Sequence, residues 1–352
     1  MFFCLKILNF AHNMKKVFLY ICALFSVGAI VAAYSAYSLF SSPFEISEKA
    51  YVYIDDDDTM DSVRAKVEAE GRAGNMFGFT LTSWVKNFKT PRTGRYAITP
   101  GEDMFTFARH MANGMQEPVH LTVPQVRTVE DMEVRLGKML MIDSAQIADV
   151  LGDSVFMDSL GYKKETVPCL FVPNTYDVYW NITPKNLILK LHNEKERFWT
   201  EERRNKAKAN GFTIEEVATL ASIVESETSY NPEKATIAGL YINRLRIEMP
   251  LQSDPTIIFA IHDFGIHRVT HEQLKYESPY NTYMNIGLPP GPIRIPSIFG
   301  IDAVLNYDHN DYLYMCAKED FSGSHNFTKD YNEHMRNARR YQQALNERGI
   351  TK

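Results

Sequence analysis

The chain has 352 residues, of which 45% are hydrophobic and 23% charged. This composition is typical of a globular protein and excludes a disordered or collagen-like chain. The 38 basic and 43 acidic residues give a net charge of -5. Because a general nucleic-acid binder needs an extended basic patch, we expect no nucleic acid among the partners of this protein.

Four cysteines are spread along the chain, at Cys4, Cys22, Cys169 and Cys316. They show neither the CxxC nor the CxxH spacing of a structural zinc site, and they are too few for a disulfide-dense scaffold. We expect Cys169 and Cys316 to be buried thiols, with a disulfide between them as the alternative. The sequence predicts no metal site.

An uncharged apolar segment runs from residue 17 to residue 40. As a helix, at about 1.5 Å per residue, it would be about 36 Å long, enough to cross a hydrocarbon core of about 30 Å. We therefore predict a transmembrane helix at residues 17–40. A cleaved signal peptide, with a cleavage region at residues 33–36, is the alternative, although its apolar part is usually only about 7–15 residues long.

The charges around this segment predict its orientation. Lys15 and Lys16 come directly before it, and the positive-inside rule then keeps residues 1–16 in the cytoplasm as a short tail. We expect a single-pass protein of the cell (inner) membrane whose remaining chain is periplasmic or extracytoplasmic. Met14 is an alternative start to Met1.

The chain beyond the membrane is long enough for about two domains. Residues 45–160 alternate short strand-like and helical runs, which predicts a small α+β subdomain. Residues 161–352 are mainly helical, and the fold class is therefore α+β. The clearest predicted elements are strands at 50–54, 94–98 and 120–123 and helical stretches at 59–70, 103–113, 184–210 and 326–348.

One predicted helix carries two neighbouring glutamates. Thr213 and Glu216 form a capping box at its start, and Pro232 predicts its end near residue 229, so we expect about 17 residues. Apolar side chains recur at helical spacing and predict one buried stripe, made of Ile214, Val217, Leu220, Ala221 and Val224.

Glu225 and Glu227 lie two positions apart on this helix and therefore point in different directions. They are not the paired acid and base of an ordinary glycosidase, so one must act alone. Glu227 is favoured, because the helix C-terminus and the apolar stripe both raise the pKa of a carboxyl group there. A raised pKa suits a general acid. The alternative is that Glu227 merely faces solvent.

Several motifs in series resemble one known family. They are residues 220–228 (LASIVESET), 241–245 (YINRL), 251–256 (LQSDPT), 278–283 (SPYNTY), 287–293 (GLPPGPI), 312–314 (YLY) and 323–327 (GSHNF). In this order they resemble the YceG-like, MltG-type family of membrane-anchored endolytic peptidoglycan transglycosylases. Upstream the resemblance is thinner: Asn174 replaces the usual aspartate of an FPDTY segment, and Gly94-Arg95-Tyr96 falls where the family has a LysM-like subdomain.

The resemblance implies both architecture and a catalytic residue. Residues 45–160 would be the LysM-like subdomain and residues 161–352 a YceG-like catalytic domain with a lysozyme-like helical core. The family's catalytic glutamate corresponds to Glu227. The segment from Glu227 to Pro232 is also similar to the signature of soluble lytic transglycosylases and goose-type lysozymes.

The implied activity is endolytic murein transglycosylation, a lyase reaction without a metal or cofactor. Glu227 would protonate the oxygen between N-acetylmuramic acid and N-acetylglucosamine and then take a proton from the muramic C6 hydroxyl, which leaves a 1,6-anhydro end. The partners would be peptidoglycan strands, whose growth the enzyme would terminate, and, as further candidates, peptidoglycan synthases.

Groove and supporting residues are predicted from the same motifs, since sugars need amide, carboxylate and aromatic partners. Each of them has a structural role as its alternative. They are Glu225, Asn243, Gln252, Asp254, Tyr280, Asn281 and His325.

Two other functions stay open. A muramidase-type hydrolase would use Asp254 as a second carboxylate and water as the nucleophile. A non-catalytic peptidoglycan-binding scaffold would work through the LysM-like subdomain, although the intact sequence around Glu227 argues against it.

Overall fold

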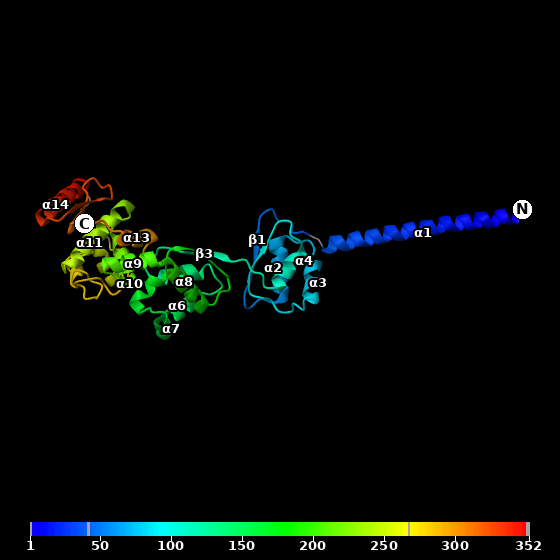
Figure 1. Cartoon of the computed structure of the whole chain (residues 1–352), viewed down its shortest axis with the longest axis horizontal. Coiled ribbons are helices and arrows are strands. Elements are labelled where there is room, and N and C mark those ends of the chain that lie inside the picture. Colours follow the sequence, from blue (N-terminus) through cyan, green and yellow to red (C-terminus); the bar gives the residue numbers. More distant parts are fainter. Residues whose placement is uncertain (1, 41–42, 267, 350–352) are drawn as a thin grey trace. The chain divides into compact units, whose positions relative to one another are not determined.

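The computed structural model describes residues 2–40, 43–266 and 268–349. The chain mixes helices and short strands and is mostly helical (Figure 1). This confirms the expected α+β class with an apolar helix at the N-terminus.

The chain divides into two compact units. The first is Met1–Val119 with Tyr179–Asn181, and the second is His120–Val178 with Ile182–Lys352. The division therefore falls near residue 119, whereas we expected it near residue 160, because the helices between these positions pack with the second unit. The LysM-like and lysozyme-like characters of the two parts stay predictions.

The N-terminal helix α1 (Phe2–Phe40) contains the predicted membrane segment. Its stretch Lys16–Ser35 has a mean hydropathy of 2.3, and none of it is buried. By length and composition this stretch can cross a membrane, and a signal sequence near the N-terminus would have the same properties.

The rest of the first unit is an antiparallel strand pair with helices. Its elements are β1 (Ala50–Ile54), α2 (Met60–Gly71), α3 (Phe77–Val85), β2 (Gly94–Ile98) and α4 (Met104–Ala112). Ala50 pairs with Ile98 and Ile54 with Gly94, so that Val52, Ile54 and Ile98 lie on the buried face. Thr59 forms a capping box at the start of α2. The predicted strands and helices of this unit are confirmed.

From β3 onward the elements belong to the second unit, apart from the first residue of that strand. They are β3 (Val119–Val123), α5 (Val129–Gly137), α6 (Ser144–Gly152), α7 (Ser154–Ser159), η1 (Lys164–Leu170), β4 (Asn174–Val178), α8 (Pro184–Phe198), α9 (Glu201–Asn210), α10 (Ile214–Glu227), η2 (Asn231–Glu233), α11 (Lys234–Arg246), α12 (Asp254–Ile261), η3 (Gln273–Lys275), α13 (Ile298–Leu305), β5 (Tyr314–Ala317), β6 (His325–Thr328) and α14 (Tyr331–Glu347), where η marks a 3-10 helix. Strand β3 pairs with β4, and β5 pairs antiparallel with β6.

Two helical stretches predicted as continuous are divided. The stretch 184–210 breaks between α8 and α9, because Trp199 turns into the core and Thr200 caps the second helix. The stretch 326–348 begins with strand β6, and Asp330 caps α14 only after it. In both cases a Thr or Asp capping side chain marks a helix start that periodicity alone does not reveal.

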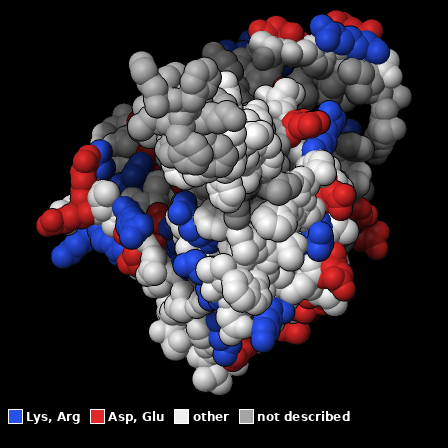
Figure 2. All heavy atoms as spheres, turned by 90° about the vertical axis from the view of Figure 1, so that its right-hand side faces the viewer, with Lys and Arg blue, Asp and Glu red and all other residues white. Residues whose placement is uncertain are grey.

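The core of the second unit is built around α10, which contacts α9, α11, α12 and α13. The thiol of Cys169 is buried and that of Cys316 partly buried, and both are free, as expected. On the face drawn in Figure 2, acidic and basic side chains are interspersed among the coloured atoms.

Candidate active site

Helix α10 brings Glu227 to the edge of the core. The capping box of Thr213 and Glu216 is confirmed, but the helix has 14 residues instead of about 17 and ends at Glu227 because Thr228 is extended. We predicted one buried stripe; instead every residue from Val217 to Val224 is buried. The partly exposed positions begin at Glu225, where the helix leaves the core.

The carboxylate of Glu227 receives two hydrogen bonds on the same oxygen. Tyr241 donates its hydroxyl to Oε1 at 2.6 Å, and Ser253 donates its hydroxyl to Oε1 at 2.5 Å. Oε2 accepts no hydrogen bond from the described residues, and it is not among the fully enclosed polar atoms without a partner. One oxygen is thus held in place, while Oε2 has no hydrogen-bond partner among the described residues and is not fully enclosed.

Burial raises the pKa of Glu227 above its usual value near 4.5, and the negative charge of Asp254 raises it further. The hydrogen bonds from Ser253 and Tyr241 and the charge of His325 act in the opposite direction, and burial prevails. The raised pKa agrees in direction with the expectation from the helix end. It favours the protonated form that a general acid requires.

Ser253 occupies the cap position of α12, but its side chain does not cap that helix. Its hydroxyl is directed to Glu227 instead. The segment is fixed by Arg244, whose guanidinium donates to the carbonyls of Pro250 at 3.1 Å and Leu251 at 2.8 Å. The backbone N–H of Ser253 also donates to the hydroxyl of Thr282 at 3.0 Å.

Tyr241 and Ser253 were not among the predicted site residues. Tyr241 is a buried residue of α11, and its sequence position indicates only a core side chain. Ser253 precedes a proline-containing helix start, which indicates only a cap. Both lie within the motifs 241–245 and 251–256, and those motifs were the only signal that could have identified them.

Glu225 belongs to a different network. It accepts from Lys234 Nζ at 2.8 Å and from Ser297 Oγ at 2.6 Å, and the side chains of Glu225 and Lys234 are only 10% and 3% exposed. Gly300 leaves room for this carboxylate, since a Cβ there would lie 2.7 Å from Glu225 Oε2. Both oxygens are used internally, so the structure supports a stabilising role for Glu225 instead of the predicted contact with a sugar.

Two predicted groove residues, Asp254 and His325, lie near Glu227, and a third, Gln252, directly precedes its partner Ser253. Asp254 and Gln252 are exposed, and Asp254 accepts from the Tyr283 hydroxyl at 2.5 Å. His325 is the first residue of β6, and its Nδ1 is 3.0 Å from the Glu233 carboxylate. The charges of Asp254 and His325 both act on Glu227, which places these two residues near the carboxylate.

The two predicted asparagines are used inside the protein. Asn281 is fully buried, and its amide donates to the carbonyls of Leu274 and Tyr276. The amide of Asn243 donates to the carbonyls of Asn310 and Tyr312. The structure therefore favours the structural alternative for both residues.

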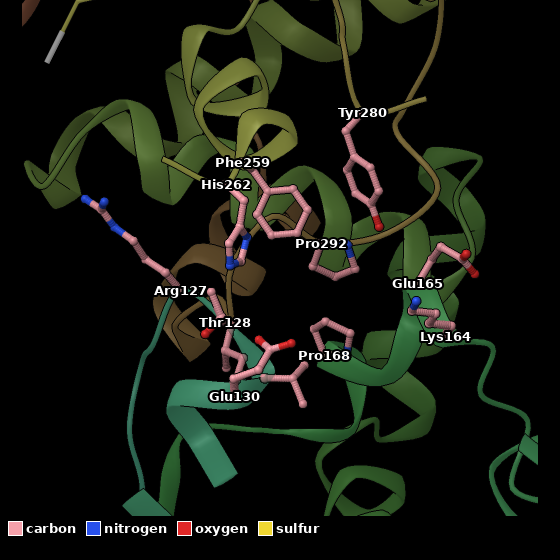
Figure 3. Close-up of a pocket in the computed structure, with 12 residues that line it drawn as sticks. Arg127, Thr128, Glu130, Lys164, Glu165, Pro168, Phe259, His262, Tyr280 and Pro292 are labelled. Atoms are coloured by element: carbon pink, nitrogen blue, oxygen red, sulfur yellow. The ribbon is translucent and has the colours of Figure 1, made fainter. Parts of the chain in front are cut away.

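Tyr280 lines a separate cavity of about 370 Å³, shown in Figure 3. Its ring lies 4.8 Å from that of Phe259. The cavity is bounded on the other side by Pro168, Lys164 and Glu165, which lie in η1. The aromatic pair and the charged rim suit a sugar or peptide chain, so the predicted binding role of Tyr280 stays a prediction.

Comparisons with known proteins agree on one family. The model of the YceG-like family matches residues 52–340. The endolytic murein transglycosylase of Bacillus subtilis is 28% identical over 274 residues, covering 73% of this chain and 75% of that protein. The endolytic murein transglycosylase of Streptococcus pneumoniae D39 is 25% identical over 307 residues, and the match covers 78% of this chain and 56% of that protein.

A crystal structure of a YceG-like protein from Listeria monocytogenes has a similar fold. It is 25% identical, with a TM-score of 0.52, and the match covers 82% of this chain and 99% of that one.

Proposed function

The chain belongs to the YceG-like family, and from this premise we propose that it is an endolytic murein transglycosylase. Its substrate would be the peptidoglycan strand, cut internally between N-acetylmuramic acid and N-acetylglucosamine. The observation that carries the proposal is the carboxylate of Glu227, whose pKa is raised and whose Oε2 is open while Oε1 is held by Tyr241 and Ser253.

In the proposed reaction Glu227 first acts as the acid. The proton on Oε2 passes to the oxygen that links the two sugars, the bond from muramic C1 to this oxygen breaks, and positive charge develops at C1. The oxygen of the muramic C6 hydroxyl then forms a bond to C1, and its proton returns to Glu227. The products are a 1,6-anhydromuramic end and a new N-acetylglucosamine end with a free hydroxyl.

The surroundings of Glu227 support this one-carboxylate scheme. Glu225 is tied to Lys234 and Ser297, so it is not available as a second catalytic carboxylate. The substrate's own hydroxyl replaces the water that a hydrolase would activate. Tyr241 and Ser253 position the carboxylate and stabilise its ionised form between the two proton transfers.

A muramidase-type hydrolase is the second candidate. Asp254 is exposed and close enough for its charge to raise the pKa of Glu227. An inverting hydrolase needs such a second carboxylate to activate water. The hydrogen bond from Tyr283 to Asp254 would have to leave the other Asp254 oxygen free for this purpose.

The membrane location is part of the proposal. The apolar stretch Lys16–Ser35 would anchor the enzyme in the cell membrane, with the N-terminus in the cytoplasm and both compact units outside. There the enzyme would meet nascent strands and terminate them, beside the peptidoglycan synthases that make them.

One incubation separates these functions. The full chain in detergent is mixed with purified uncrosslinked glycan strands in water enriched in heavy oxygen, and the products are weighed. A transglycosylase yields ends that are lighter by one water than reducing ends, resist borohydride and contain no heavy oxygen. Heavy oxygen at muramic C1 would indicate the hydrolase, and binding without any cleavage would indicate the scaffold.

A further inference from the structure

Two arginines share a small cavity beside the catalytic helix. This cavity, here called the arginine cavity, has a volume of about 180 Å³ and is lined by Arg127, Arg294, Ser226, Pro255, Ile258 and Phe264, among others. Burial lowers the pKa of Arg294, the negative charge of Glu225 raises it, and the charge of Arg127 lowers it further, because two guanidinium groups in one small space repel each other.

Neither arginine has an acidic partner in an ion pair among the residues that the structure describes. Among the described residues, the Nε of Arg294 is buried without a hydrogen-bond partner. Arg127 is exposed; it makes one long hydrogen bond, of 3.5 Å, to the carbonyl of Phe264, and its guanidinium lies 5.3 Å from the centre of the Phe264 ring. The buried lysines Lys234 and Lys195, in contrast, both pair with carboxylates. Since buried donors are normally paired, the Nε of Arg294 can still accept an anionic ligand in the arginine cavity.

The arginine cavity lies beside the C-terminal turn of helix α10. Ser226 directly precedes Glu227, and Pro255 directly follows Asp254, so two of its lining residues are chain neighbours of the site residues. Figure 3 shows that the side chain of Arg127 extends away from the other labelled residues around Tyr280. Arg127 therefore lines both cavities, and its guanidinium extends away from Tyr280.

We propose that Arg127 and Arg294 bind a free carboxylate of the peptide stem that muramic acid carries. This inference rests on the proposed function. Guanidinium groups bind carboxylates through paired, charge-assisted hydrogen bonds, and the apolar walls formed by Ile258 and Phe264 suit the aliphatic part of an amino acid. A volume of about 180 Å³ admits such a group but not a disaccharide.

A lipid-linked diphosphate has the same anionic oxygen chemistry. It occurs only at the end of a growing strand, whereas stem carboxylates occur at each muramic acid along the strand. Since the proposed enzyme cuts within strands, the stem is the better match to a cavity lined by chain neighbours of the site residues.

The test compares three substrates with the full chain in detergent: strands with intact stems, strands whose stems an amidase has removed, and stem-free strands that keep the lipid diphosphate. We expect Arg294→Gln and Arg127→Gln each to raise KM about tenfold on intact strands, with kcat little changed, and to have no effect on stem-free strands. Arg336→Gln, an exposed arginine on α14, is the matched control. Arg294→Lys keeps the charge and should retain most of the preference for stems.

Equal losses on intact and stem-free strands would overturn the proposal, as would no loss on either. A loss that depends on the lipid diphosphate would assign the arginine cavity to that group instead. Binding of intact and stem-free strands is also measured by fluorescence anisotropy in a Glu227→Gln background. Because this readout needs no turnover, it tests the arginine cavity even if the wild-type chain cleaves nothing, and weaker binding of intact strands by Arg294→Gln is the expected result.

Discussion

The carboxylates of Glu225 and Glu227, two positions apart on α10, belong to two hydrogen-bond networks with no shared partner among the described residues. Glu225 is paired with Lys234 and Ser297 inside the protein, and Glu227 is held by Tyr241 and Ser253 with one oxygen open. The same helix thus carries one carboxylate that is paired inside the protein and one that we propose for catalysis.

Replacement of Glu227 should remove the activity without unfolding the protein. Glu227→Gln keeps the size of the side chain but cannot donate and retake a proton, so we expect turnover of glycan strands to fall at least about 100-fold. Product release is measured by mass spectrometry and folding by thermal melting. Glu225→Gln is the neighbouring comparison and should cost less activity when it is assayed at a temperature at which melting shows both variants to be folded; equal losses under these conditions would show that the roles are assigned wrongly.

Tyr241 and Ser253, the two hydrogen-bond donors to Oε1 of Glu227, should set the pH at which kcat/KM falls. Removing a donor that stabilises the ionised form raises the pKa of Glu227, so Tyr241→Phe and Ser253→Ala should both move the alkaline fall of kcat/KM to higher pH.

A matched control for Tyr241→Phe exists in the same unit. Tyr307 is also buried, and its hydroxyl accepts a hydrogen bond from Arg246 at 2.7 Å. Tyr307→Phe therefore loses a comparable hydrogen bond and should leave the profile in place. A profile that shifts equally in both variants would indicate a general loosening of the fold.

The ionisation of Glu227 should oppose folding. Its pKa is higher in the folded chain than in the unfolded chain, so the stability that it contributes is present below the usual pKa near 4.5 and is lost as pH rises through the folded value. As the pH rises from about 4.5 through the folded pKa, the wild type should lose stability that Glu227→Gln does not lose. The free energy of unfolding of the variant, relative to the wild type, should therefore increase over this pH range. Urea unfolding at a series of pH values measures the difference, and a constant difference would contradict the raised pKa.

The Glu225–Lys234 pair should matter for stability. Removing one partner leaves a buried charge uncompensated, so Glu225→Gln or Lys234→Met should each lower the free energy of unfolding by about 3–5 kcal/mol. The double variant should lose less than the sum of the two single losses, because neither charge then remains. Additive losses in urea unfolding would show that the two side chains are not coupled.

The orientation in the membrane is open to a direct test. If residues 1–16 are in the cytoplasm, the C-terminus lies outside it. A reporter enzyme that folds only outside the cytoplasm should therefore be active when it is fused after Lys352. Activity of a reporter that needs the cytoplasm would contradict this orientation. A mature protein that begins near Ser35 would show that the apolar segment is a cleaved signal.

Local elements were the most predictable part of the fold. The strand at 94–98 and the capping box at Thr213 follow from alternation and capping chemistry over a few residues. The boundary between the units was not predictable in this way. Residues 120–160 have the same local patterns as the preceding segment, and only their packing with distant helices assigns them to the second unit.

At the site, helix periodicity separated Glu225 from Glu227 but could not identify their partners. Tyr241 and Ser253 lie 14 and 26 residues after Glu227, and no local rule joins positions so far apart. The full burial of Asn281 was missed for a different reason: its partners are close in sequence, the carbonyls of Leu274 in η3 and of Tyr276 just after it, but this segment shows no hydrophobic periodicity that would predict its folding around the amide.

The open Oε2 of Glu227 limits how the proposed reaction can proceed. Oε1 already has two donors, so the proton that leaves and the proton that returns must both pass through Oε2. The bridging oxygen and the C6 hydroxyl would therefore have to occupy the same small region one after the other. The carboxylate stays fixed, so the muramic ring would have to turn and bring its hydroxyl to Oε2 after the glycosidic bond has broken. The order of events would then be set by the movement of the sugar, and a rigid substrate analogue that prevents this rotation should stop after the first proton transfer.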